Sequence, residues 1–120
     1  MKKPLLLVLS IMFTGLIALN AKEIQLQSPD GNLQVVVTVD KEISWSAQLK
    51  GKPVLEKAVV AMELSDRVLG PEARLAKQSV KEVKQEIQVA VPYKDAIIED
   101  HCNELSLQFR ERFSLTFRAY

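Results

Sequence analysis

The feature that most constrains the fold of this chain is an alternation of apolar and polar residues with a period of two. Five runs show it, at residues 33–39, 43–49, 87–93, 105–110 and 113–119. Successive side chains of a strand point to opposite faces, so each run predicts a strand with one buried and one wetter face. Such strands are typical of antiparallel sheets that cover a core on one side. The sequence therefore predicts an all-β fold, an antiparallel β-sandwich.

The alternation also predicts which side chains form the core. We expect eight of them to be buried: Val35, Val37, Ile43, Trp45, Leu107, Phe109, Leu115 and Phe117. Trp45 alternates with serines and is in register with apolar neighbours, so it is predicted to lie in the core rather than to serve as an exposed platform for a sugar.

Residues between the runs favour tight connections. Asp40-Lys41-Glu42 has the length of a short hairpin loop, and Glu111-Arg112 joins the last two runs. Lys50-Gly51-Lys52-Pro53 follows the second run, where glycine can take a positive φ and proline is expected to end the ladder.

The middle of the chain is harder to interpret. Residues 54–64 predict one or two strands, with residues 59–62 apolar on both faces, as in a strand buried on both sides. A loop is expected from Ser65 through Pro71. Residues 72–86 fit an amphipathic helix, or a loop that leads into an exposed strand from about Ser79; we favour the strand because its neighbours are β.

The first 21 residues have the layout of a secretory signal peptide. Lys2 and Lys3 precede an apolar run of 15 residues, and Leu19-Asn20-Ala21 resembles a cleavage site. The alternative is a retained membrane anchor, but this run is shorter than the about 20 residues that span a bilayer. We therefore expect a mature domain of residues 22–120 that is periplasmic or secreted and has no membrane partner after signal removal.

Composition excludes several classes of protein. The formal net charge is +1 without a basic stripe, which argues against a nucleic-acid partner. A single cysteine excludes a disulfide scaffold and a multi-cysteine zinc site. Cys102 is predicted to be a free, buried, small apolar residue, with an intermolecular disulfide as the alternative.

The densest polar cluster is Glu99-Asp100-His101-Cys102-Asn103-Glu104. If it lies on a strand, Asp100, Cys102 and Glu104 share one face and His101 lies on the other, so these ligand types do not converge on one metal ion. The prediction is a solvated loop or the start of a strand.

Candidate carboxylates for acid–base chemistry are scattered through turns and strand ends. They are Glu23, Asp30, Asp40, Glu56, Glu63 and Asp66. Spacing alone selects no pair that could face each other across a cleft. From its residues the sequence thus predicts no catalytic, no cofactor-binding and no metal site.

Five segments, in this order, carry a family resemblance. They are residues 26–33 (LQSPDGNL), 43–46 (ISWS), 51–56 (GKPVLE), 99–105 with Glu99-Asp100 and Asn103-Glu104-Leu105, and 117–120 (FRAY). Together they resemble the N-terminal domain of family 97 glycoside hydrolases, the secreted α-glucosidases and α-galactosidases.

The resemblance implies a galactose-mutarotase-like β-sandwich that is incomplete at its C-terminal end. It implies a (β/α)₈ catalytic barrel as the partner domain, an oligo- or polysaccharide as ligand, and calcium in the complete enzyme but not in this chain. No functional residue is carried over, and His101 and Cys102 receive no role. The strand pattern of residues 113–120 stops without a cap, so we expect the chain to end inside a larger domain.

The resulting functional prediction is a non-catalytic sandwich, with a carbohydrate-binding or scaffold role, from a glycoside hydrolase that acts on α-glycosides. Whether the chain should be called an enzyme is left open. The alternatives are a free-standing carbohydrate-binding module and a secreted domain that binds partners by strand addition.

Overall fold

The computed structural model describes residues 21–90 and 97–120, and within them it contains strands but no helix. Those ranges accordingly hold no helix that is long and apolar enough to cross a membrane. The strands are β1 (Lys22–Gln27), β2 (Leu33–Val39), β3 (Ile43–Leu49), β4 (Lys52–Val60), β5 (Met62–Glu63), β6 (Val68–Leu69), β7 (Leu75–Gln88), β8 (Ile97–Phe109) and β9 (Ser114–Ala119). All their pairings are antiparallel, which confirms the predicted fold class.

The first sheet is a meander in the order β1-β2-β3-β4. Its register places Ile24 opposite Val37 and Leu26 opposite Val35, so the apolar positions of neighbouring strands meet on one face. That face is buried while most of the intervening residues are wetter, as period-two alternation predicts. The alternation therefore sets which side of this sheet covers the core.

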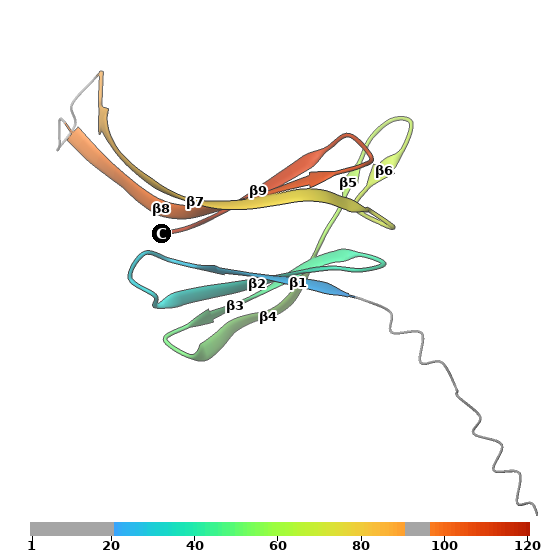
Figure 1. Ribbon diagram of the computed structural model, residues 1–120, viewed down its shortest axis with the longest axis horizontal. Helices are drawn as coiled ribbons and strands as arrows, with labels where there is room; N and C mark the ends of the chain where they lie inside the picture. Colours follow the sequence, from blue (N-terminus) through green and yellow to red (C-terminus); the bar gives the residue numbers. More distant parts are fainter. Residues whose placement is uncertain (1–20, 91–96) are drawn as a thin grey trace, which may run out of the picture.

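The second sheet has the order β7-β8-β9 and lies over the first, so that the two sheets form the layers of a sandwich (Figure 1). Leu105, Leu107 and Phe109 of β8, together with Ala119 of β9, join the buried apolar residues of the first sheet in one cluster. A polar link also crosses the layers, because Asn103 Nδ2 donates a hydrogen bond to the carbonyl oxygen of Gln27 at 2.8 Å.

The predicted core is confirmed, although its eight side chains are not all buried to the same degree. Five of the eight expected side chains are buried: Val35, Val37, Ile43, Leu107 and Phe109. The other three, Trp45, Leu115 and Phe117, are half-buried and pack against that cluster. Trp45 and Phe117 meet edge-to-face, with ring centroids 6.1 Å apart, so one aromatic pair joins the two sheets.

The predicted hairpin connections are present, with one correction. Residues 40–42 join β2 to β3, and residues 110–113 join β8 to β9. Lys50 and Gly51 both have positive φ, 50° and 77°, as a two-residue hairpin turn requires. Pro53, however, does not end the ladder: it lies inside β4, opposite Gln48. An edge strand tolerates proline because its missing N–H would have faced no partner.

Two predictions for residues 54–71 are wrong. Val59 and Met62 are 56% and 61% exposed, so this stretch is not a strand buried on both sides. It belongs to the edge strand β4, which packs on the core with one face only, through Leu55 and Val60, and to the two-stranded ribbon β5–β6. The expected loop also contains β6. Gly70, directly after β6, lies so close to the Val60 carbonyl oxygen that a Cβ there would be 2.6 Å from it, so glycine, at φ 119°, permits this approach.

Strand β7 settles the ambiguous segment in favour of a strand. It begins at Leu75, earlier than the expected Ser79, and pairs with β8 from Leu75–Phe109 to Gln88–Ile97. Paired backbone groups hold this polar sequence extended although its side chains favour a helix in isolation. The predicted run at residues 87–93 ends as a strand at Gln88, and its residues 91–93 lie outside the described residues.

The predicted signal peptide also lies outside the described residues, except for Ala21. The cleavage site therefore stays a prediction.

Candidate functional site

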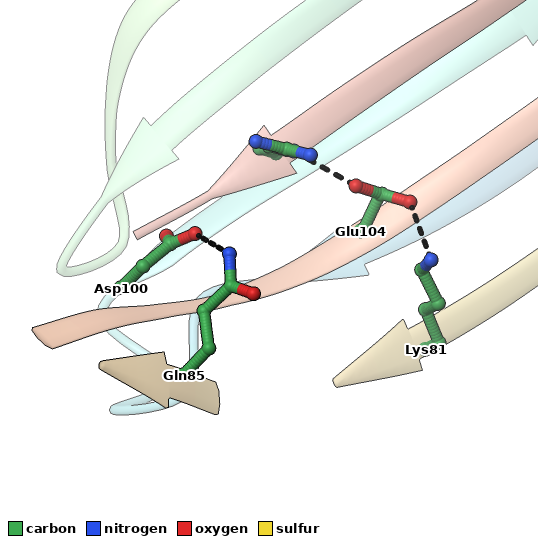
Figure 2. A network of polar contacts seen from close by, with 5 residues as sticks. Lys81, Gln85, Asp100 and Glu104 are labelled. Carbon is green, nitrogen blue, oxygen red and sulfur yellow. Dashed lines mark hydrogen bonds and ion pairs between the residues drawn. The ribbon is translucent and has the colours of Figure 1, made fainter. Parts of the chain in front are cut away.

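A network of polar contacts lies on the side of the second sheet that faces away from the first sheet, which we call the outer face. Glu104 is buried there between two cations from the flanking strands (Figure 2). Its Oε1 lies 3.2 Å from Lys81 Nζ of β7, and its Oε2 accepts a hydrogen bond from Arg118 Nε of β9 at 2.8 Å. The hydrogen bond from Arg118, followed by that from Lys81, lowers the pKa of the Glu104 carboxyl.

Register explains why these three residues meet. Glu104 of β8 is opposite Lys81 of β7 and opposite Arg118 of β9, so the three side chains rise from the same side of the sheet. Opposite charges placed directly across strands stabilise a sheet. The cluster therefore joins all three strands, and Glu104 is held as an ionised acceptor rather than as an acid that could release a proton near neutral pH.

Asp100 lies four residues before Glu104 on the same face of β8, with Cys102 between them. Its Oδ2 accepts a hydrogen bond from Gln85 Nε2 at 2.8 Å (Figure 2). The residue is only 8% exposed, and within the described part of the chain its Oδ1 is buried without a hydrogen-bond partner. Asp100 is thus a buried carboxylate with unused capacity to accept a hydrogen bond.

Tyr120 follows β9 and lies near this group. The Arg118 guanidinium acts to lower the pKa of the Tyr120 hydroxyl, but partial desolvation together with the charge of Asp100 and the nearby Cys102 outweighs it, so the pKa is raised. The tyrosine is therefore neutral at physiological pH, and 62% of it remains exposed to solvent.

The polar cluster of residues 99–104 was predicted to be a solvated loop or the start of a strand. It lies instead in the middle of β8. Cross-strand partners bury Asp100, Cys102 and Glu104, which sequence alone does not reveal. The predicted sharing of faces is correct: these three lie on the outer face, and His101 lies on the other face with its Nε2 2.7 Å from Glu82 Oε1. Residues 21–90 and 97–120 hold no group of three metal-ligating side chains.

Cys102 is a free, buried thiol, as predicted. It is fully buried between Asp100 and Glu104 on the outer face, opposite Val83. The expectation of a small apolar residue in a packed position is thereby confirmed, although the position is not in the core between the sheets.

The scattered carboxylates form no pair. All six candidates are exposed: Glu23, Asp30, Asp40, Glu56, Glu63 and Asp66. Asp30 alone is held in place, by Ser28 Oγ and by the backbone and side chain of Asn32. The hydrogen bond from Ser28 and that from the Asn32 backbone lower the pKa of Asp30, which makes it a turn-forming residue before β2.

Lys81, Gln85, Arg118 and Tyr120 were not singled out by sequence reasoning. Each sits at an ordinary polar or terminal position of an alternating run, and only the pairing of β7 with β8 and of β8 with β9 brings them to Asp100 and Glu104. The available signal was the matching spacing of residues 81 and 85 with 100 and 104, but using it requires knowledge of the register.

Comparison with known proteins gives the family. The family model described as Glycosyl-hydrolase 97 N-terminal matches residues 26–120. A retaining alpha-galactosidase from Bacteroides thetaiotaomicron is 32% identical over 122 residues, an alignment that takes in 100% of this chain and 18% of the galactosidase. The chain therefore spans less than a fifth of the length of that relative.

Solved structures agree on the fold. A glycoside hydrolase family 97 enzyme in complex with acarbose, from Pseudoalteromonas sp. strain K8, matches with a TM-score of 0.70 and 20% identity over 81% of this chain and 16% of the enzyme. A beta-arabinopyranosidase matches with a TM-score of 0.65 and 22% identity; the match covers 82% of this chain and 16% of the arabinopyranosidase. The family match over residues 26–120, the galactosidase relative and the shared sandwich lead to one conclusion: this chain belongs to the N-terminal domain family of glycoside hydrolases of family 97.

Proposed function

We propose that this chain is the non-catalytic N-terminal sandwich of an enzyme that hydrolyses α-glycosides, and that it acts as a scaffold beside a (β/α)₈ catalytic barrel. The observation that carries the proposal is the family match over residues 26–120, together with a galactosidase relative of which the chain corresponds to only 18%. In that arrangement the barrel supplies the acid–base carboxylates, the calcium ligands and the specificity for the sugar.

The geometry of the described residues supports a role without catalysis. The two buried carboxylates, Asp100 and Glu104, are four residues apart on one strand, which separates their backbones by about 13 Å at the usual rise of a strand. Their carboxylates are also bound by different side chains, Asp100 by Gln85 and Glu104 by Lys81 and Arg118. Glu104 is also held ionised by Lys81 and Arg118, so it is suited to support the sheet and not to protonate a leaving group.

A contribution to saccharide binding is also part of the proposal. Trp45 is engaged with Phe117 between the sheets, which leaves Tyr120 as the aromatic side chain with the largest exposed fraction among the described residues. A sugar that stacks on Tyr120, beside the buried carboxylates, would make a contact additional to those in the catalytic barrel.

The proposed compartment is the periplasm or the exterior of the cell, reached through the signal peptide of residues 1–21. The basic start and the 15-residue apolar run support it. Fractionation of the producing cells, with N-terminal sequencing of the exported protein, should give a chain that begins near Lys22; an exported protein with an intact Met1 would contradict the signal peptide.

Activity measurements test the proposal directly. The 120-residue chain and the longest reading frame that contains it are each assayed with p-nitrophenyl α-galactoside and α-glucoside. We expect release of p-nitrophenol from the long protein only, since residues 21–90 and 97–120 bring no pair of carboxylates to a common site. Release by the 120-residue chain would refute the non-catalytic role, and an inactive long protein would refute the glycosidase assignment.

A further inference from the structure

The buried side of β8 changes along the strand. From Leu105 to Phe109 the buried residues are Leu105, Leu107 and Phe109, which face the first sheet. From Ile97 to Glu104 the buried residues are Asp100, Cys102 and Glu104, which face away from it. The change falls between adjacent residues, Glu104 and Leu105, and needs no bulge, because the register of β7 with β8 is continuous there. One strand therefore has packing surfaces on both sides of its sheet.

The far ends of β7 and β8 extend past the first sheet and bend away from it (Figure 1). We call the outer side of this stretch the distal outer face; its residues are Val83, Gln85, Ile87, Ile98, Asp100 and Cys102. Ile87 and Ile98 are directly opposite each other and are 44% and 52% exposed. Two neighbouring isoleucines exposed on one face add an apolar patch beside the buried Asp100 and Cys102.

The opposite side of the same stretch is mostly polar, with Ile97, 53% exposed, at its end. It carries Glu82, Lys84, Glu86, Glu99 and His101, with an ion pair between Lys84 and Glu99 and a hydrogen bond between His101 and Glu82. This extension is thus amphipathic, and its apolar side is the distal outer face rather than the side that continues the core. An amphipathic sheet buries its apolar side against another element.

Asp100 adds a specific chemical demand to this face. Its Oδ1 is buried and has no hydrogen-bond partner among the described residues, although the Tyr120 hydroxyl lies beside this carboxylate. A buried acceptor left unpaired is unfavourable. A packing element that covers Ile87 and Ile98 would also reach the neighbouring pair Gln85–Asp100. It would relieve that cost if it brought an N–H donor to Oδ1.

We propose that the distal outer face docks a further segment of the complete enzyme, one that places an apolar side chain over Ile87 and Ile98 and an N–H donor on Asp100 Oδ1. This inference rests on the proposed function, because the occupant is polypeptide that lies outside these 120 residues. The length of the galactosidase relative, of which this chain spans 18%, provides such polypeptide. A covalently linked segment also has a high effective concentration, so a small patch suffices for docking.

Thiol alkylation in the long protein tests the proposal. Ile98→Cys places a reporter on the distal outer face, and the matched control Glu99→Cys places one on the next residue, which is also exposed but lies on the opposite side of β8. Each variant is made in the long reading frame and in the 120-residue chain. Iodoacetamide labelling is followed by peptide mass mapping, which distinguishes each new thiol from Cys102.

We expect the I98C thiol to react roughly tenfold or more slowly in the long protein than in the 120-residue chain, because a docked thiol reacts only through local opening. The E99C thiol should react at similar rates in both. Equal rates for I98C in the two proteins would overturn the docking proposal, even if the long protein hydrolyses α-glycosides.

Two further outcomes separate this proposal from the proposed function and from other occupants. Protection of I98C in a long protein that hydrolyses no α-glycoside would support docking and refute the glycosidase assignment. Protection in the 120-residue chain that grows with protein concentration would identify a second copy as the occupant, and would overturn the proposal.

Discussion

The two halves of β8 share one strand and one partner, β7, yet they differ in what they bury. The half from Leu105 to Phe109 packs leucine and phenylalanine onto the first sheet, whereas the half from Ile97 to Glu104 buries two carboxylates and a thiol on the outer face. The pairing with β7 is regular from Ile97 to Gln108 and shifts register only at the end of the second half, between Leu75 and Lys77. The difference teaches that backbone hydrogen bonds between strands hold β8 extended, whereas the alternation of its side chains shows only which face of the sheet is buried.

The largest expected effect is at the half that packs on the core. Leu107→Ala removes a fully buried side chain between the sheets and should lower the free energy of unfolding by about 2–5 kcal/mol. Ile98→Ala, in the other half, removes an exposed side chain and should cost at most about 1 kcal/mol in the 120-residue chain. Denaturation in urea, followed by circular dichroism, measures both. Equal losses would mean that the two halves are not distinct environments.

An intermediate effect is expected where the halves meet. Arg118, and after it Lys81, lower the pKa of Glu104 below its ordinary value of 4.5. A lowered pKa in the folded chain adds stability that is complete above the unfolded value and is lost as the pH falls through the folded value. Glu104→Gln should therefore be less stable than the parent at pH 7, and the difference should shrink as the pH falls below about 4.5.

Thermal melts of both proteins between pH 7 and pH 3 measure this difference. Glu63→Gln, at an exposed carboxylate of β5, is the matched control and should follow the parent at every pH. A difference between Glu104→Gln and the parent that stays constant down to pH 3 would show that the ion pairs with Lys81 and Arg118 do not stabilise the fold.

The smallest effect is expected on the polar side of the extension. Lys84 Nζ lies 3.9 Å from Glu99 Oε1, and both side chains are largely exposed. Exposed ion pairs contribute little, so Lys84→Ala should change the free energy of unfolding by no more than about 0.5 kcal/mol. Urea denaturation at low and at high salt measures it. A loss comparable with that of Leu107→Ala would show that the extension is held by this face and not by its pairing.

Much of the fold could be predicted because the alternation is regular where the sheets face each other. Val35, Val37 and Ile43 are buried as expected, and the hairpin at residues 40–42 joins the expected strands. Family membership was likewise predicted from short segments in order, and the match over residues 26–120 confirms it.

The candidate site could not be predicted in the same way. Asp100 and Glu104 look solvated in sequence, since carboxylates are seldom buried without partners. Their partners, Gln85, Lys81 and Arg118, are 14 to 23 residues away and come into place only through the register of three strands. The exposure of Val59 and Met62 was missed for the converse reason: an apolar run does not reveal that its strand lies at an edge.

The edge-to-face pair of Trp45 and Phe117 has a spectroscopic consequence. Trp45 is the sole tryptophan of the chain, and it lies at the boundary between the two layers. Its fluorescence therefore reports on a single event, the closure of the second sheet over the first. Separation of the layers would hydrate the indole and shift its emission to the red even if every hairpin stayed intact, so the intrinsic fluorescence of this domain measures layer closure while far-ultraviolet circular dichroism measures strand content.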